Sequence, residues 1–211
     1  MRFNEFLTED FATEQIIMNQ VKTIRQNCQP YLTQNRDAIN RFPLYRGVKK
    51  TNEAKVIRKE VRLDDRKPKD MPLKLHQFIN GYFKKHYGAA FRNAMFVTSS
   101  VGNASEYGDV YLIFPAGNLQ YLWSADYEDL YSITGEFGFE SMHGDWNNER
   151  WQDAQELLVD QVLSTYQTDG LEKAIDSSHE IMIRCPYYYG IHSDVMYNKP
   201  LREQIIDGLY R

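Results

Sequence analysis

The spacing of apolar residues changes its period along the chain, and this change limits the fold more than any other feature of the sequence. Residues 10–28 carry apolar side chains at helical spacing, and a second, shorter helix is predicted over 31–41. From residue 44 onward, short apolar runs of strand length alternate with further helical segments. Helices that precede scattered strands, without a repeating strand–helix–strand unit, predict an α+β fold.

The elements expected after residue 44 are separated by turn-forming residues. Strands are predicted over 44–48, 54–61, 94–97, 110–114, 119–123, 180–185 and 187–191. Helices are predicted over 70–87, over 148–168 with Gly170 as its stop, and over 201–209, and Ser124 is expected to cap a short helix that ends near Tyr131. Two loops are expected, a Gly-rich one over 132–147 and a second over 168–178.

Composition excludes several classes of protein. The formal charge of −4 leaves no overall basic surface for nucleic acid, and no apolar run approaches the roughly 20 residues that a membrane span needs. The two cysteines, Cys28 and Cys185, are far apart and have no zinc-ligand spacing, so neither a disulfide framework nor a metal site is expected. The segment 49–69 is locally basic, but acids are interleaved with its cations, which favours a solvated face over a nucleic-acid surface.

Three short segments carry the residue types of a catalytic site. Arg46 lies inside the first predicted strand and is followed by Gly47, three hydroxyl residues follow the strand 94–97, and Glu180 opens a later apolar strand. Each segment alone is ordinary: an arginine or glutamate at a strand end is usually solvated, and Ser and Thr are common where a strand becomes a turn. The order in which the three follow one another is the informative feature.

In this order they resemble the Arg / Ser-Thr-Ser / Glu signature of the arginine-type ADP-ribosyltransferases, of the kind packaged by T-even-like phages, over roughly residues 42–191. The resemblance implies a split β-sheet core with helices and NAD as the substrate. It assigns catalysis to Glu180, Arg46 and Thr98, and it requires no metal. The NAD-binding residues that it implies are Arg46, Gly47, Thr98, Ser99, Ser100 and Tyr107.

The chemistry of these residue types agrees with those roles. A bidentate guanidinium suits a pyrophosphate, and a fixed carboxylate stabilises the oxocarbenium character that develops when the nicotinamide–ribose bond breaks. The sequence departs from the signature at Thr98, which replaces a serine, and at Ser178, which replaces the first acid of the family's Glu-x-Glu. Because that acid is associated with the acceptor arginine, another acceptor or simple NAD hydrolysis becomes more plausible. His179 is expected to face the opposite side of the strand from Glu180 as a structural residue.

The first nine residues, from Met1 to Glu9, resemble the capsid-targeting leaders of internal head proteins in such phages. The predicted organisation is therefore a leader over 1–9, a helical segment over 10–41 and an ADP-ribosyltransferase-like domain over 42–211. The expected function is transfer of ADP-ribose from NAD to a host macromolecule, a protein or a nucleic acid, by an enzyme located in the phage head and then in the host cytoplasm. The alternatives are an NAD glycohydrolase of the same fold, a non-catalytic internal head protein, and a nucleic-acid-binding module that uses 49–69.

Overall fold

The helix-to-strand order predicted from the sequence is present in the computed structural model, so the chain has an α+β fold. The structure describes residues 3–36, 44–49, 51–52, 54–68, 71–139 and 149–210, with the side chains of the first helix described from Thr13 onward. These residues belong to two units. Unit 1 comprises Met1–Glu60, Ser100–Leu119 and Cys185–Arg211, and unit 2 comprises Val61–Ser99 and Gln120–Arg184.

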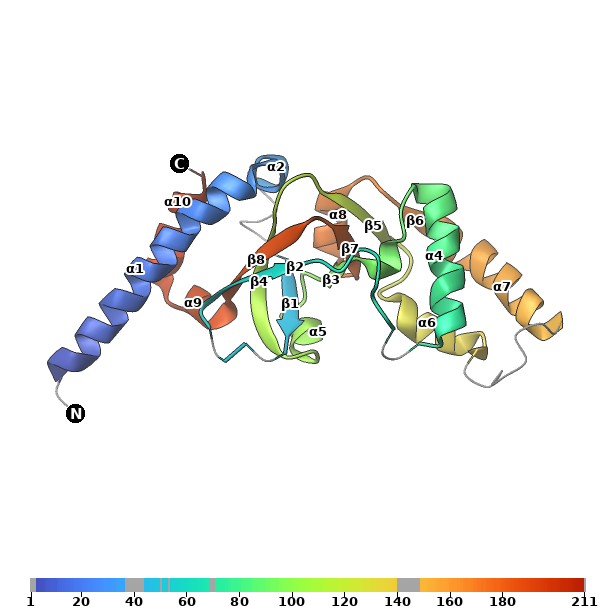
Figure 1. Cartoon of the computed structure of the whole chain (residues 1–211), viewed down its shortest axis with the longest axis horizontal. Helices are drawn as coiled ribbons and strands as arrows, with labels where there is room; N and C mark the ends of the chain where they lie inside the picture. The colour runs from blue at the N-terminus through green and yellow to red at the C-terminus, as the bar shows by residue number, and fades with distance from the viewer. Residues whose placement is uncertain are drawn as a thin grey trace. The chain divides into compact units, whose positions relative to one another are not determined.

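Unit 1 contains one antiparallel sheet and the helices at both ends of the chain (Figure 1). Its helices are α1 (Phe3–Asn27), α2 (Gln29–Gln34), α5 (Val101–Ser105), α9 (Ser193–Tyr197) and α10 (Lys199–Tyr210). Its strands are β1 (Tyr45–Val48), β2 (Val56–Glu60), β4 (Asp109–Pro115) and β8 (Tyr187–His192), and they lie in the order β1-β4-β8-β2. The two central strands β4 and β8 come from distant parts of the sequence and pair in register from Tyr111–His192 to Pro115–Tyr188.

Helices α1 and α10 pack against each other along their apolar stripes (Figure 1). Ile17, Val21 and Ile24 of α1 are buried, and each such side chain contributes about 1.5–3 kcal/mol relative to full exposure. Ile16, which the sequence placed on the same stripe, is instead 61% exposed. The helices approach closely at Gly208, where an added Cβ would lie 3.0 Å from a methyl carbon of Val21.

Unit 2 contains the second antiparallel sheet, whose strand order is β3-β7-β5-β6. Its strands are β3 (Met95–Val97), β5 (Gln120–Ser124), β6 (Tyr166–Gln167) and β7 (Ile181–Arg184). Its helices are α4 (Leu73–Tyr87), α6 (Leu130–Glu136), α7 (Glu149–Gln161) and α8 (Leu171–Ser177), with short 3-10 turns at Phe91–Asn93 and Leu163–Thr165. The core joins α4 to the sheet, since Leu75, Ile79 and Phe83 are packed in one cluster with Leu122 and Met182.

All seven predicted strands are confirmed as elements, with bounds shifted by one or two residues, and so are the helices 70–87 and 201–209. Helix α4 begins after Pro72 as expected and ends at Gly88, whose left-handed φ of 79° closes it. The predicted helix 10–28 begins earlier, at Phe3. The predicted helix 31–41 is present as α2 over Gln29–Gln34, and residues 37–43 lie outside the described part of the chain.

The prediction of one helix over 148–168 is wrong at its end. Helix α7 ends at Gln161, and Tyr166 instead pairs with Ser124 as strand β6. The reason is tertiary: the Tyr166 side chain is 5% exposed and packs with its ring centroid 5.1 Å from that of Phe83. Gly170 therefore does not stop α7 but precedes α8, in a left-handed conformation with φ 67°.

The two predicted loops are also partly wrong. The segment 168–178 contains helix α8, and the segment 132–147 begins inside helix α6. Helix α6 is capped by Asp129, whose carboxylate accepts a hydrogen bond from the Ser132 amide at 2.8 Å, and not by Ser124, which ends strand β5. Residues 140–147 of the predicted Gly-rich loop lie outside the described residues.

Candidate functional site

Arg46 and Gly47 lie in strand β1 of unit 1, directly opposite Tyr111 and Val110 of β4. Burial raises the pKa of the Tyr188 hydroxyl in the same unit, and the Arg46 guanidinium, a hydrogen-bond partner of that hydroxyl, partly offsets this rise. Arg46 therefore lies beside the Tyr188 hydroxyl and can hold it in place. The arginine is partly exposed to solvent.

Gly47 is required by the packing of the chain itself. A Cβ added to Gly47 would lie 2.1 Å from the Ala104 carbonyl oxygen and 2.9 Å from the Gly108 nitrogen. No side chain can occupy that space without displacing the connection between α5 and β4. The close approach of α5 therefore requires a glycine at this position.

Ser100 and Tyr107 also belong to unit 1. Ser100 is the N-cap of α5, where its hydroxyl accepts a hydrogen bond from the Asn103 amide at 3.2 Å. Tyr107 follows α5 in the turn next to Gly47, and its side chain is 61% exposed. An exposed ring in this place does not belong to the core and can stack on a flat ligand.

The other two hydroxyl residues, Thr98 and Ser99, lie at the end of β3 in unit 2 and bind the segment that leads to Glu180. The Thr98 hydroxyl donates to the Ser178 carbonyl at 2.7 Å. The Ser99 hydroxyl donates to the Ile175 carbonyl at 2.5 Å and lies 3.0 Å from the Ser178 hydroxyl. Together they cap the C-terminus of α8, whose last carbonyl groups have no partner within the helix.

Ser178 adopts a left-handed backbone conformation, with φ 63° and ψ 7°, at the end of α8. Only glycine and asparagine adopt this conformation readily, and other residues lose about 1–2 kcal/mol in it. The hydrogen bonds from Thr98 and Ser99 hold Ser178 in this conformation, which reverses the chain between α8 and β7. Ser178 is therefore a structural residue of the turn, and it contributes no carboxylate.

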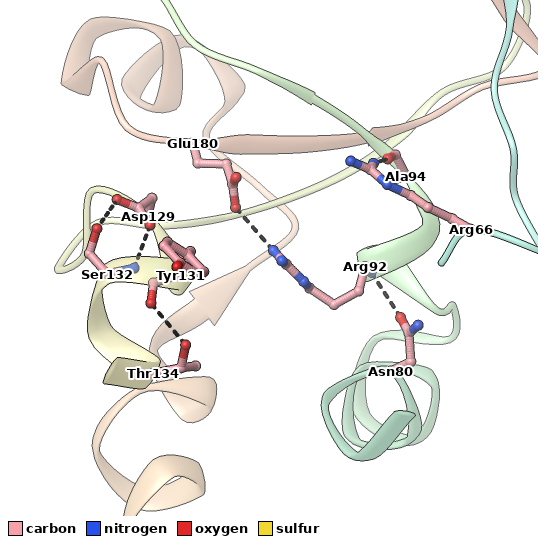
Figure 2. A network of polar contacts seen from close by, with 9 residues as sticks. All are labelled: Arg66, Asn80, Arg92, Ala94, Asp129, Tyr131, Ser132, Thr134 and Glu180. Atoms are coloured by element: carbon pink, nitrogen blue, oxygen red, sulfur yellow. Dashed lines mark hydrogen bonds and ion pairs between the residues drawn. The ribbon is translucent and has the colours of Figure 1, made fainter. Parts of the chain in front are cut away.

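Glu180 stands directly before β7, which pairs with both β3 and β5. Its backbone amide donates to the Glu128 carbonyl at 2.7 Å, which fixes the main chain at this position. Its carboxylate Oε1 lies 3.4 Å from Nη1 of Arg92, as Figure 2 shows. The Glu180 side chain is 24% exposed and that of Arg92 is 10% exposed, so this acid is held and still reached by solvent.

His179, between Ser178 and Glu180, has the structural role expected of it. Its ring Nδ1 lies 2.9 Å from the Ser124 carbonyl oxygen, and its backbone amide donates to the Ser177 hydroxyl at 3.1 Å. These contacts tie the turn to the end of β5, so both residues that precede Glu180 serve to place it.

Sequence reasoning missed Arg92, the ion-pair partner of Glu180. Arg92 lies in the 3-10 turn Phe91–Asn93, and 88 residues separate it from Glu180. No spacing pattern marks such a pair. The one available signal was an arginine in an otherwise apolar segment just before the strand that ends in the hydroxyls.

The cysteines and surface ion pairs of the described residues lie outside the segments considered so far. Among the residues that the structure describes, no group of three or more His, Cys, Asp or Glu side chains could hold a metal ion. Burial raises the pKa of Cys28 and of Cys185 from 9.0 to about 12, so both are protonated, unreactive thiols. In the basic segment, Arg62 pairs with Asp65 at 3.0 Å and Arg58 with Glu60 at 3.9 Å, as expected for a solvated face.

Within the described part of the chain, no helix is both long enough and apolar enough to cross a membrane. Comparison of the sequence with protein-family models and with curated proteins finds no match, and comparison of the structure with solved structures finds none either.

Proposed function

We propose that this protein is an NAD-dependent mono-ADP-ribosyltransferase with an ADP-ribosyltransferase-like fold. One observation carries the proposal: the Thr98 and Ser99 hydroxyls bind the turn that leads into Glu180. In the family that the sequence resembles, the hydroxyl motif supports the catalytic glutamate in this manner. The two hydroxyls reach this turn because β3 pairs with β7, and their contacts join residues 76 or more positions apart in the sequence.

The proposed reaction begins with heterolysis of the bond between nicotinamide and C1′ of ribose. Nicotinamide leaves with the bonding electron pair, and an acceptor nucleophile then forms a bond to C1′ and loses its proton. Positive charge develops on the ribose, and the Glu180 carboxylate, fixed by its backbone and by Arg92, stabilises that charge. In this proposal Arg46 holds the pyrophosphate and Tyr107 stacks on nicotinamide, with Gly47 and Ser100 beside them.

NAD hydrolysis is the second candidate, and Ser178 favours it. Ser178 occupies the position of the family's first acid. Its carbonyl accepts a hydrogen bond from Thr98 and its hydroxyl is bonded to Ser99, at the end of α8. No carboxylate is therefore present there to activate an acceptor side chain. Water, which needs no recognition by the protein, can serve as the nucleophile in its place.

The biological setting proposed from the resemblance is a phage. Residues 1–9 would direct the protein into the head, and the enzyme would enter the host with the DNA and modify a host protein or nucleic acid. A non-catalytic head protein of the same fold would need the leader but not Glu180. The catalytic test below separates these two functions.

The test measures nicotinamide release from NAD and transfer of labelled ADP-ribose to host lysate. Glu180→Gln keeps the size and polarity of the side chain and removes its charge, so we expect the rate to fall by at least about 100-fold. Glu172→Gln makes the same change on an exposed residue of α8 and should leave the rate unchanged. Transfer identifies a transferase, and release without transfer identifies a glycohydrolase. Wild-type protein that neither cleaves NAD nor modifies lysate would refute both.

A further inference from the structure

A buried arginine holds the acid on which the proposed reaction depends. Arg92 lies 3.4 Å from Glu180, and the structure explains why the guanidinium is in that place (Figure 2). We infer that Arg92 is the positioning residue of the Glu180 carboxylate. This inference rests on the proposed NAD chemistry, and it deepens that proposal by adding a residue outside the Arg / Ser-Thr-Ser / Glu motif.

The backbone of Arg92 is fixed by a network of buried amides. The Arg92 amide donates to the Asn80 side-chain oxygen at 2.9 Å. The Asn80 side-chain nitrogen lies 3.1 Å from the Asn93 side-chain oxygen and 3.0 Å from Nε2 of His76. Burial lowers the pKa of His76, which favours its neutral ring, and Nε2 of that ring also lies 3.2 Å from the Asn93 side-chain oxygen. The Asn93 side-chain nitrogen donates in turn to the Leu63 carbonyl at 3.0 Å.

The guanidinium itself is oriented by an aromatic ring. It lies 4.7 Å from the centroid of Phe96, and the guanidinium of Arg66 lies 4.0 Å from the same ring. Phe96 is in β3, directly opposite Met182 of β7. Glu180 stands two residues before Met182. The pairing of β3 with β7 therefore brings the Phe96 ring, against which the Arg92 guanidinium lies, close to Glu180.

The ion pair between Arg92 and Glu180 is better suited to orienting the carboxylate than to stabilising the fold. A buried ion pair contributes little net stability, since the loss of hydration offsets the attraction between the charges. The Nε of Arg92 is also buried without a hydrogen-bond partner among the described residues, which adds a further cost. If Glu180 were only a solvated surface acid, it would need no buried arginine beside it. The distance of 3.4 Å exceeds the roughly 2.7–2.9 Å of a strong charge-assisted bond, so the cation directs the carboxylate while leaving it able to stabilise positive charge on ribose.

The test is steady-state NAD cleavage by variants of the whole chain. Arg92→Ala should lower kcat by about 10- to 100-fold and change KM for NAD by less than about 3-fold, because misplacement of an acid affects the transition state more than substrate binding. Arg92→Lys keeps the charge but loses the planar fork, so we expect a smaller fall, about 3- to 10-fold. Arg62→Ala is the control. It removes a solvated guanidinium of unit 2, which pairs with Asp65 at 3.0 Å, and its kcat should stay within about 3-fold of wild type.

A double-mutant cycle identifies the partner of Arg92. If Arg92 acts through Glu180, then Arg92→Ala should lower the residual rate by less than about 3-fold when Glu180 is already Gln. A full second loss in the Glu180→Gln background would overturn the inference, because Arg92 would then act elsewhere.

The outcomes separate this inference from the proposed function. Wild type without NAD cleavage overturns both. An active wild type whose kcat survives Arg92→Ala overturns the inference alone, as does a rise in KM at constant kcat, which would make Arg92 an NAD-binding residue. Should Arg92→Ala fail to fold, judged by circular dichroism, Arg92→Lys decides: a lowered kcat at constant KM supports the inference, and an unchanged kcat overturns it.

Discussion

The hydroxyl of Thr98 offers the sharpest test of how the Glu180 turn is built. Thr98→Val keeps the shape of this buried side chain and removes the 2.7 Å hydrogen bond to the Ser178 carbonyl. A neutral hydrogen bond contributes about 1 kcal/mol net, and a partly buried carbonyl such as that of Ser178, left without this partner, raises the loss to about 1–3 kcal/mol. Ser178 is in a left-handed conformation that already costs about 1–2 kcal/mol, and the Thr98 hydrogen bond is one of the contacts that hold it there. We expect the free energy of unfolding to fall by about 1–3 kcal/mol.

The assay is urea unfolding followed by tryptophan fluorescence, since Trp123 and Trp151 both belong to unit 2. Thr98→Ser is the control: it keeps the hydroxyl, loses one methyl group and should cost no more than about 1 kcal/mol. The reasoning is refuted if Thr98→Val unfolds within about 0.3 kcal/mol of wild type, or if Thr98→Ser is the more destabilised of the two, because the methyl group and not the hydroxyl would then matter.

Two further predictions concern unit 1. Gly47→Ala should destabilise the protein by about 1–3 kcal/mol, because its Cβ would meet the Ala104 carbonyl oxygen at 2.1 Å, and an unchanged Tm would contradict this. Cys28 and Cys185 have a pKa raised from 9.0 to about 12, so the folded state binds more protons than the unfolded state between these values. Their contribution to stability is complete below pH 9 and is lost as pH rises from about 9 to 12. Replacing both with alanine should flatten this alkaline fall, and native protein at pH 8 should resist thiol alkylation that proceeds in denaturant.

The elements that the sequence by itself determined are those whose signal is local. In α4, Leu75, Phe78 and Ile79 all pack on the core, and their spacings of three and four residues place them on one face of a helix, whereas a strand would turn Phe78 to the opposite face. The strands around Arg46 and Glu180 were also predictable, because short apolar runs of about four to eight residues bounded by turn residues favour a strand. From these elements the α+β class followed, and so did the ends of the strands at which the candidate site residues stand.

Only the tertiary structure decided which of these residues meet. Tyr166 leaves the helical register of α7 because its ring is better buried against Phe83 in the core than along a solvated helix. Arg92 meets Glu180 because β3 and β7 pair, and Thr98 caps α8 for the same reason. These contacts join residues about 80 positions apart, and their energy exists only after the sheet has formed. A pattern that extends over a few residues cannot contain that information.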